Sequence, residues 1–212
     1  MFDFSLSQIL ASAVILLVAF PAHELAHALT ADYFGDDTPR LQGRLTLNPL
    51  AHLDLFGSLL LLVAGFGWAK PVQVNPYILA QRSKSAPAIV ALAGPVTNFF
   101  LGILGAIPLW LGIVPLPAGD LNKLSLFMFL YFFAFINFIL FFFNLIPLFP
   151  LDGEKVLFQF AGPELQRRLM KFRTYQFIPL LIILWVLPRF GIPVIDWLVF
   201  NPAIRLINLF GG

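Results

Sequence analysis

Residues 6–33, LSQILASAVILLVAFPAHELAHALTADY, decide how the rest of the chain can be arranged. The first half of this stretch is apolar enough to enter a lipid bilayer, yet the second half carries His23, Glu24 and His27. A charged side chain at the bilayer centre costs roughly 2.5–3.5 kcal/mol on insertion scales, so such residues need partners. The stretch therefore predicts a membrane helix that contains a polar site.

The composition supports a membrane protein. Of the 212 residues, 59% are hydrophobic and only 11% are charged, whereas a soluble domain carries about 25% charged residues. The net charge of +2 is too small to suggest nucleic-acid binding. The chain has no cysteine, which excludes disulfides and thiolate metal sites.

The long apolar runs predict an all-α polytopic membrane protein, a bundle of four or more transmembrane helices in a single domain, residues 1–212. A span needs ~20 apolar residues. The first run has no basic flank before it and no small-residue cleavage site after it, so we expect a retained span. Residues 193–210 could form a further short or interfacial helix. The predicted spans are about residues 6–33, 85–113, 124–147 and 175–190.

The connection between the first two spans differs from them in its pattern of apolar and polar residues. RLQGRLTLN at 40–48 and KPVQVN at 70–75 alternate as strands do, which predicts a small membrane-associated β-sheet. HLDLFGSLLLLVAGFG at 52–67 is too short for a span and is a candidate re-entrant segment. Irregular backbone at membrane depth requires burial in protein or a wet cavity, and a sheet beside a polar cavity would satisfy that condition.

The basic residues predict the orientation in the cell membrane. They gather in the connections after the first and third spans, whereas the N-terminal flank has none and the loop after the second span has only Lys123. Because cytoplasmic loops are rich in Lys and Arg, we expect a cytoplasmic location for both connections and an N-terminus outside. The residues are Arg40, Arg44, Lys70, Arg82, Lys84, Lys155, Arg167, Arg168, Lys171 and Arg173.

HELAH at 23–27 matches the pattern H-E-x-x-H. Histidines at i and i+4 lie on one face of a helix, so both rings can reach one metal ion, and the intervening Glu24 can take a proton from a water on that metal. Imidazole ligands with an open position describe a catalytic zinc site. The pattern can also arise by chance, but three ionisable residues on adjacent turns of an apolar helix would be costly without a metal or a hydrated cavity.

A catalytic zinc ion usually takes three protein ligands and one water. The only other histidine is His52, and the acids near apolar runs are Asp54, Asp152 and Glu154. Topology favours Asp152, because the first and third spans both run inward. HELAH lies near the cytoplasmic end of the first span, and Asp152 directly follows the third. As an alternative, Asp152 could simply cap the following helix.

Three further residues are candidates for supporting roles. Asn98 lies within the second span and Asn144 at the end of the third. Either could make an interhelical packing hydrogen bond worth about 1 kcal/mol, or could donate to a substrate backbone or a developing oxyanion. For His52 we favour a structural or gating role over metal ligation.

The chain resembles the site-2 protease family of intramembrane metalloproteases. The matching pieces are HELAH at 23–27, GPVTN at 94–98 and NLIPLFPLDG at 144–153, in the family's order. RLTLNPLAHLDLFGSLL at 44–60 is also similar to the stretch that follows the first motif in compact members. No PDZ domain, nucleotide-sensing domain or preceding span is evident, so the resemblance is to a minimal form.

The resemblance implies one Zn²⁺ per chain, held by His23, His27 and Asp152, with Glu24 as the general base. Asn144 and Pro150 match positions that support the active site or the substrate. The family cleaves transmembrane segments of other proteins, often releasing membrane-tethered regulators such as anti-sigma or transcription factors. The expected partners are therefore transmembrane protein substrates and the lipid bilayer, without nucleic acid.

Two other readings of the sequence stay open. The same ligands could line the ion path of a metal-binding membrane transporter, or the chain could be an inactive relative that acts as a membrane scaffold. Glu24 is the residue that separates the readings, because a transport site has no need of a base between its ligands.

Overall fold

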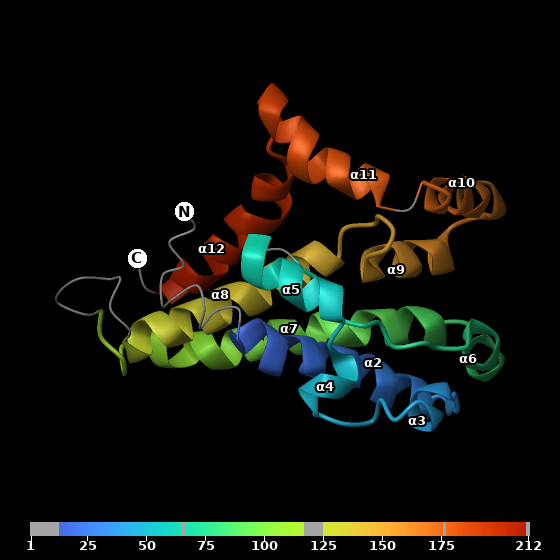
Figure 1. Ribbon diagram of the computed structural model, residues 1–212, viewed down its shortest axis with the longest axis horizontal. Coiled ribbons are helices and arrows are strands. Elements are labelled where there is room, and N and C mark those ends of the chain that lie inside the picture. The colour runs from blue at the N-terminus through green and yellow to red at the C-terminus, as the bar shows by residue number, and fades with distance from the viewer. Residues whose placement is uncertain (1–12, 65–66, 117–124, 176, 211–212) are drawn as a thin grey trace.

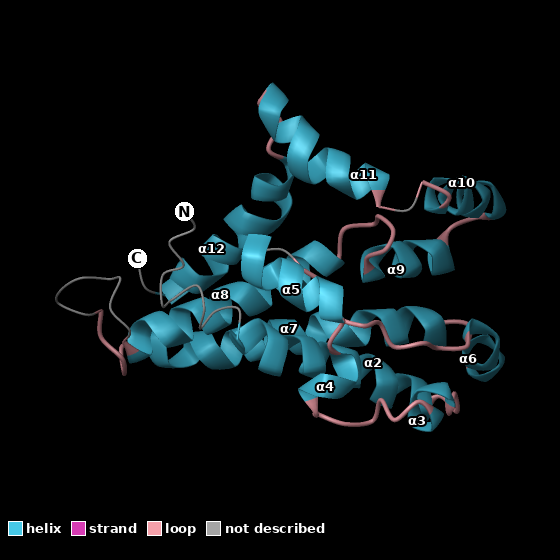
Figure 2. Cartoon of the chain, viewed as in Figure 1, coloured by secondary structure: helices cyan, strands magenta, loops and turns pink. Residues whose placement is uncertain are grey.

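The computed structural model describes residues 13–64, 67–116, 125–175 and 177–210, and these residues form helices joined by loops (Figure 2). The long helix α7, Ala86–Trp110, is the centre of the arrangement. It packs against α2 (Phe20–Tyr33), α8 (Leu126–Asn144) and α9 (Asp152–Phe160). In Figure 1, α7 and α8 run alongside each other.

The contact between α7 and α8 is close because small residues of α7 face large rings of α8. A Cβ atom at Gly102 would lie 2.6 Å from the ring of Phe138, which is fully buried. Burial of a phenylalanine side chain contributes about 1.5–3 kcal/mol. The C-terminal helix α12, Asn201–Ile207, adds Ala203 and Ile207 to the same hydrophobic cluster.

The helix that carries HELAH begins with an irregular turn. A π-helix, η1 (Ile15–Ala19), runs directly into α2 without a break, and Pro21 lies in the first turn of α2. Proline lacks the N–H group that would continue the α-helical hydrogen bonds, and π-turns are frequent at functional sites. The chain is helical from residue 13 to Tyr33, and the predicted residues 6–12 of this span lie outside the described part.

By length and composition, two described helices can cross a membrane, α7 with 25 residues and α8 with 19. A third candidate is a pair bent by 78°, formed by α10 (Pro163–Arg173) and the helical segment Ile178–Phe190. The described residues thus show two to three candidate spans, fewer than the four or more that we predicted. The segment Ile178–Phe190 consists of α11 (Ile178–Leu181), η2 (Ile182–Val186) and η3 (Leu187–Phe190).

Residues 193–210, for which the sequence left the structure open, are mostly helical. They contain η4 (Asp196–Phe200), α12 and η5 (Asn208–Phe210). Val199 is fully buried in a cluster with Leu180 and Ile146, so this segment packs onto the end of α8 and onto α11.

The β-sheet predicted between the first two spans is not seen in the described residues. This region instead contains one isolated antiparallel bridge, Leu53 to Ala69, and short helices. The helices are α3 (Thr38–Leu41), α4 (Pro49–His52), α5 (Leu55–Ala64) and α6 (Pro76–Arg82).

Side chains explain why these residues do not pair as strands. Asp36 accepts hydrogen bonds from Thr38 at the start of α3, and Pro39 occupies the first turn, so a helix forms within the alternating sequence. Residues 70–75 are free of regular secondary structure. Val72 N–H donates to the Glu24 carboxylate and Asn75 N–H donates to Asp36.

The predicted re-entrant segment contains the ten-residue helix α5, which is about 15 Å long and cannot cross a ~30 Å hydrocarbon core. The chain before and after α5 is joined by the Leu53–Ala69 bridge and by a 2.7 Å hydrogen bond from Lys70 N–H to the His52 carbonyl. The two ends of the segment, residues 52–53 and 69–70, therefore lie side by side.

Replacement of Asp36 by Ala is expected to destabilise the fold. Asp36 is fully buried and accepts from Thr38 N, Thr38 Oγ1 and Asn75 N at 3.1, 2.6 and 2.6 Å. A buried donor left without a partner costs about 1–3 kcal/mol, and each kcal/mol lowers Tm by about 2–4 °C in a protein of this size. Thermal unfolding in detergent measures the shift. The control is Asp37→Ala at the exposed neighbouring position, and equal Tm values for the two variants would contradict the assignment.

Candidate metal centre

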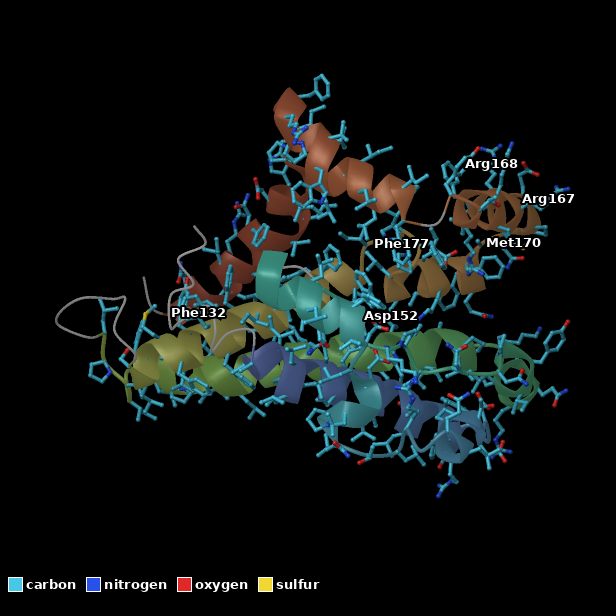
Figure 3. All side chains as sticks on the ribbon, viewed as in Figure 1. Phe132, Asp152, Arg167, Arg168, Met170 and Phe177 are labelled. Carbon is cyan, nitrogen blue, oxygen red and sulfur yellow. The ribbon has the colours of Figure 1, made fainter. Side chains whose placement is uncertain are left out.

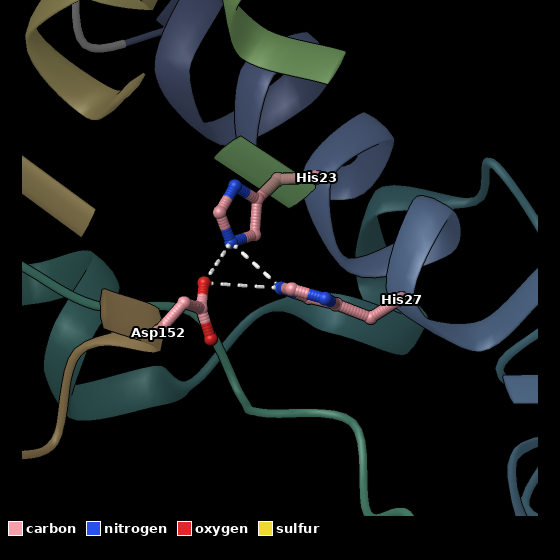
Figure 4. Close-up of side chains that lie close together, drawn as sticks. All are labelled: His23, His27 and Asp152. Atoms are coloured by element: carbon pink, nitrogen blue, oxygen red, sulfur yellow. Dashed lines mark hydrogen bonds and ion pairs between the residues drawn. The ribbon is translucent and has the colours of Figure 1, made fainter. Parts of the chain in front are cut away.

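Helix α2 places the two histidines of HELAH on one face. The Nε2 atoms of His23 and His27 lie 3.0 Å apart, and the two rings are nearly perpendicular with centroids 4.6 Å apart. Each residue is only 7% exposed. Figure 4 shows the Nε2 atoms directed at the same point, beside Asp152.

Asp152 reaches this point from the first turn of α9. Its Oδ2 lies 3.1 Å from His23 Nε2 and 3.2 Å from His27 Nε2, and the residue is 5% exposed. The ligand atoms of the three residues all lie within 4.8 Å of one another. The turn that delivers Asp152 requires glycine at the next position, because a Cβ atom at Gly153 would overlap the Leu145 carbonyl.

The second nitrogen of each ring is held by a partner on α7. His27 Nδ1 donates to the Val90 carbonyl at 2.7 Å, and His23 Nδ1 lies 2.6 Å from Asn98 Oδ1. A carbonyl oxygen can only accept, so these bonds place the hydrogen on Nδ1. The lone pairs of both Nε2 atoms are then free to bind a metal, the arrangement typical of metal-ligating histidines.

The space around the Nε2 atoms depends on Gly94 of α7. A Cβ atom at this position would lie 2.6 Å from His23 Nε2 and would overlap His27 Nε2 as well. Two neutral imidazoles and one carboxylate are also the donor set of catalytic zinc sites. The residues present therefore fit a zinc ion, both in donor type and in the space that glycine provides.

Asp152 is a carboxylate in this environment. Burial alone would raise the pKa of Asp152, but the two histidine rings beside it and the ammonium of Lys155 hold it well below its usual range. Lys155 Nζ donates to Oδ1 at 2.7 Å from one turn further along α9. The ion pair occupies Oδ1, so Oδ2 faces the histidines.

Glu24 lies beside the histidines on α2 and is 8% exposed. Its Oε2 accepts a 2.9 Å hydrogen bond from the N–H of Val72, in the extended segment that follows Lys70. The segment that we expected to be a strand therefore holds the carboxylate of the predicted base.

The other candidate residues lie outside the three-residue cluster. Asn144 donates to the Leu140 carbonyl at 3.0 Å, and Pro150 lies in the turn before Asp152. His52 is fully buried, and its Nε2 lies 2.8 Å from the Thr46 carbonyl.

Neither alternative acid joins the cluster. Asp54 accepts from Gly57 N–H, and Glu154 forms a bidentate ion pair with Arg173 at 2.8 Å. One buried polar residue near the site was not predicted, namely Asn137 on α8, which contacts Asn98. The sequence did contain a signal for Asn137, because it is a polar amide in the middle of the phenylalanine-rich third span.

Two histidines at i and i+4, a carboxylate from a distant helix and a glutamate between the histidines define a site of the metallopeptidase class. The model of Peptidase family M50 matches residues 110–186, which include Asp152. YwhC of Bacillus subtilis, which is named as a candidate zinc metalloprotease, is 41% identical over 175 residues, covering 80% of this chain and 78% of its own. The chain belongs to Peptidase family M50.

More distant relatives are longer. Rip2 of Mycolicibacterium smegmatis is 32% identical over 79% of this chain and 64% of its own, and Rip2 of Mycobacterium tuberculosis H37Rv is 30% identical over 79% and 63%. Both are named as candidate zinc metalloproteases. This chain thus spans just under two thirds of the Rip2 length. No solved structure matches the chain significantly.

Replacement of Gly94 by Ala is expected to abolish metal binding while the fold is retained. The added methyl group would occupy the space beside both Nε2 atoms, and the rings would have to leave their shared point. Zinc bound per purified chain is the measurement. The control is Gly102→Ala on the same helix, which meets the Phe138 ring and should lower Tm without loss of zinc. Full zinc content in the Gly94 variant would contradict this geometry.

Proposed function

We propose that the chain is a zinc-dependent intramembrane endopeptidase that cuts transmembrane segments of other membrane proteins. The observation that carries the proposal is the convergence of His23, His27 and Asp152 at one buried point, with Glu24 between the histidines. The helix beside this point, α7, is long and apolar enough to span a bilayer.

His23, His27 and Asp152 would hold one zinc ion per chain. When bound at such a site, zinc polarises a substrate carbonyl and lowers the pKa of a bound water to about 7. The chain supplies the rest of the chemistry. The two Nδ1 hydrogen bonds and the Lys155 ion pair fix the three ligands, so little reorganisation is needed when the substrate arrives.

Glu24 would act as the general base. Its carboxylate takes a proton from the attacking water and returns it to the amine that leaves when the peptide bond breaks. The hydrogen bond from Val72 N–H engages Oε2, so Oε1 is the oxygen we assign to proton transfer. The burial of Glu24 keeps bulk water from competing for this proton.

For the remaining candidates we propose roles that follow from their contacts. Asn98 holds His23, since its carbonyl oxygen is engaged by the ring. Asn144 and Pro150 flank the turn that delivers Asp152 and would support it or the substrate. His52 is anchored beside the Leu53–Ala69 bridge, so it would hold the base of the α5 segment rather than ligate the metal.

We propose a multi-pass cell-membrane location with the N-terminus outside and the active site towards the cytoplasm. Four spans, with α5 as a re-entrant segment, would satisfy the alternation of charged connections. In Figure 3, Arg167 and Arg168 of α10 point away from the site, whereas Asp152 lies in the interior. Release of membrane-tethered regulators is the proposed outcome of cleavage.

Replacement of Glu24 by Gln is expected to lower the rate of cleavage by about 10²–10⁴-fold, the usual contribution of a general base. The amide keeps the shape of the side chain but cannot take the proton, and zinc content should stay at one per chain. The measurement is cleavage of a model transmembrane substrate by the purified protein. Glu164→Gln, at an exposed position on α10, is the control.

Three outcomes would reject the proposal. Cleavage that survives Glu24→Gln would remove the mechanism. A native chain that binds zinc and carries it across liposomes without cleaving would be a transporter, and one that does neither would be a scaffold.

Replacement of Asp152 by Ala is expected to lower zinc content well below one per chain, because two imidazoles alone hold zinc weakly. Metal analysis after purification is the measurement, and Asp196→Ala, an exposed acid on η4, is the control. Undiminished zinc would mean that another residue supplies the third ligand.

A further inference from the structure

A chain of buried amide side chains leads away from the metal centre into α8. His23 Nδ1 lies 2.6 Å from Asn98 Oδ1, and Asn98 Nδ2 lies 2.9 Å from Asn137 Oδ1. Asn137 Nδ2 in turn donates to the Phe133 carbonyl at 2.8 Å. Both asparagines are fully buried. Figure 4 shows the starting point, since Nδ1 of His23 points away from Asp152 and His27.

The end of this chain determines the direction of every bond in it. A backbone carbonyl can only accept, so the group of Asn137 that faces Phe133 must be the NH₂. Its Oδ1 then faces Asn98 and accepts, which requires the NH₂ of Asn98 on that side. The oxygen of Asn98 is left for His23, and only a ring with its hydrogen on Nδ1 can donate to it. A second carbonyl, Ala19 O, supports the same orientation of Asn98 at a longer 3.4 Å.

We infer that Asn137 is a positioning residue of the metal centre, which holds the Asn98 amide in the one orientation that directs the Nε2 lone pair of His23 at the metal. This inference rests on the proposed zinc site. A flipped Asn98 amide would present NH₂ to Nδ1, and the ring would then carry its hydrogen on Nε2, where a metal ligand needs a lone pair. Buried amides between apolar helices have no water to correct such a flip.

His27 shows why His23 needs this device. His27 Nδ1 donates directly to a backbone carbonyl, Val90 O, which fixes its hydrogen without help. The partner of His23 is an amide that could present either end. The position of the ring hydrogen of His27 is fixed directly by a backbone carbonyl. That of His23 is fixed indirectly, because Asn137 orients Asn98 and Asn98 in turn accepts from the ring.

The test compares Asn137→Leu with Asn137→Asp. Leucine has a similar volume but removes both hydrogen bonds, so we expect zinc affinity to fall about 10-fold or more, as for other residues that orient metal ligands. An aspartate buried here is neutral, because burial disfavours the charged form. It can accept from Asn98 and donate to the Phe133 carbonyl, so we expect affinity within about 3-fold of the native protein. Thr97→Val, which removes a hydroxyl from α7 next to Asn98, is the control for lost polarity.

Zinc affinity is measured on the purified full chain by competition with a chelator, and Tm is measured in parallel. Cobalt substitution adds a spectroscopic signature, since a displaced His23 changes the visible spectrum of the bound Co²⁺. The double variant Asn98→Ala with Asn137→Leu should bind zinc no more weakly than Asn98→Ala alone, because both act through one path.

Three results would overturn the inference. One is native zinc affinity in Asn137→Leu with a lowered Tm, which would mean that Asn137 only packs the helices. A second is equal loss of affinity in the leucine and aspartate variants. The third is an additive effect in the double variant. None of these readouts uses proteolysis, so a native chain that binds zinc but cleaves nothing would reject the proposed function and leave this test valid.

Discussion

The close approach of α2 to α7 at Gly94 is the constraint on which the rest of the site depends. Without a side chain at this position, the Nε2 atoms of His23 and His27 can meet beside the α7 backbone. The same approach brings the Val90 carbonyl and the Asn98 amide within reach of the two Nδ1 atoms. One glycine thus permits both the convergence of the two histidine rings and the Nδ1 hydrogen bonds that hold them.

The sequence predicted that His23, His27 and Asp152 would lie together, and it predicted only part of the fold. HELAH has a spacing that any α-helix converts into two histidines on one face, so local geometry was sufficient. To predict that Asp152 lies near the histidines, the predicted spans also had to be counted and their directions assigned. The structure places its Oδ2 3.1 and 3.2 Å from the two Nε2 atoms, and its role as a ligand is a proposal.

The sheet was predicted wrongly because alternation of apolar and polar residues does not show which groups accept the hydrogen bonds of the backbone N–H groups. In residues 70–75 the N–H groups of Val72 and Asn75 are satisfied by the carboxylates of Glu24 and Asp36, which lie far away in sequence. A strand and a strand-like segment bonded to side chains have the same periodicity. The predicted number of spans is not confirmed by the described residues, because apolar composition does not show whether a run such as Ile178–Phe190 is a straight helix or part of a bent pair.

The polar groups around the centre explain why a metal would bind at one point. Each His Nδ1, Oδ1 of Asp152 and Oε2 of Glu24 is engaged by α7, Lys155 or Val72. The two Nε2 atoms and Asp152 Oδ2 are directed instead at one another, at distances of 3.0 to 3.2 Å. Burying two imidazoles and a carboxylate side by side is costly unless they share a partner, and a zinc ion at this point would be such a partner. Burial, which made HELAH improbable as a membrane helix, would then give the proposed site its affinity for a metal ion.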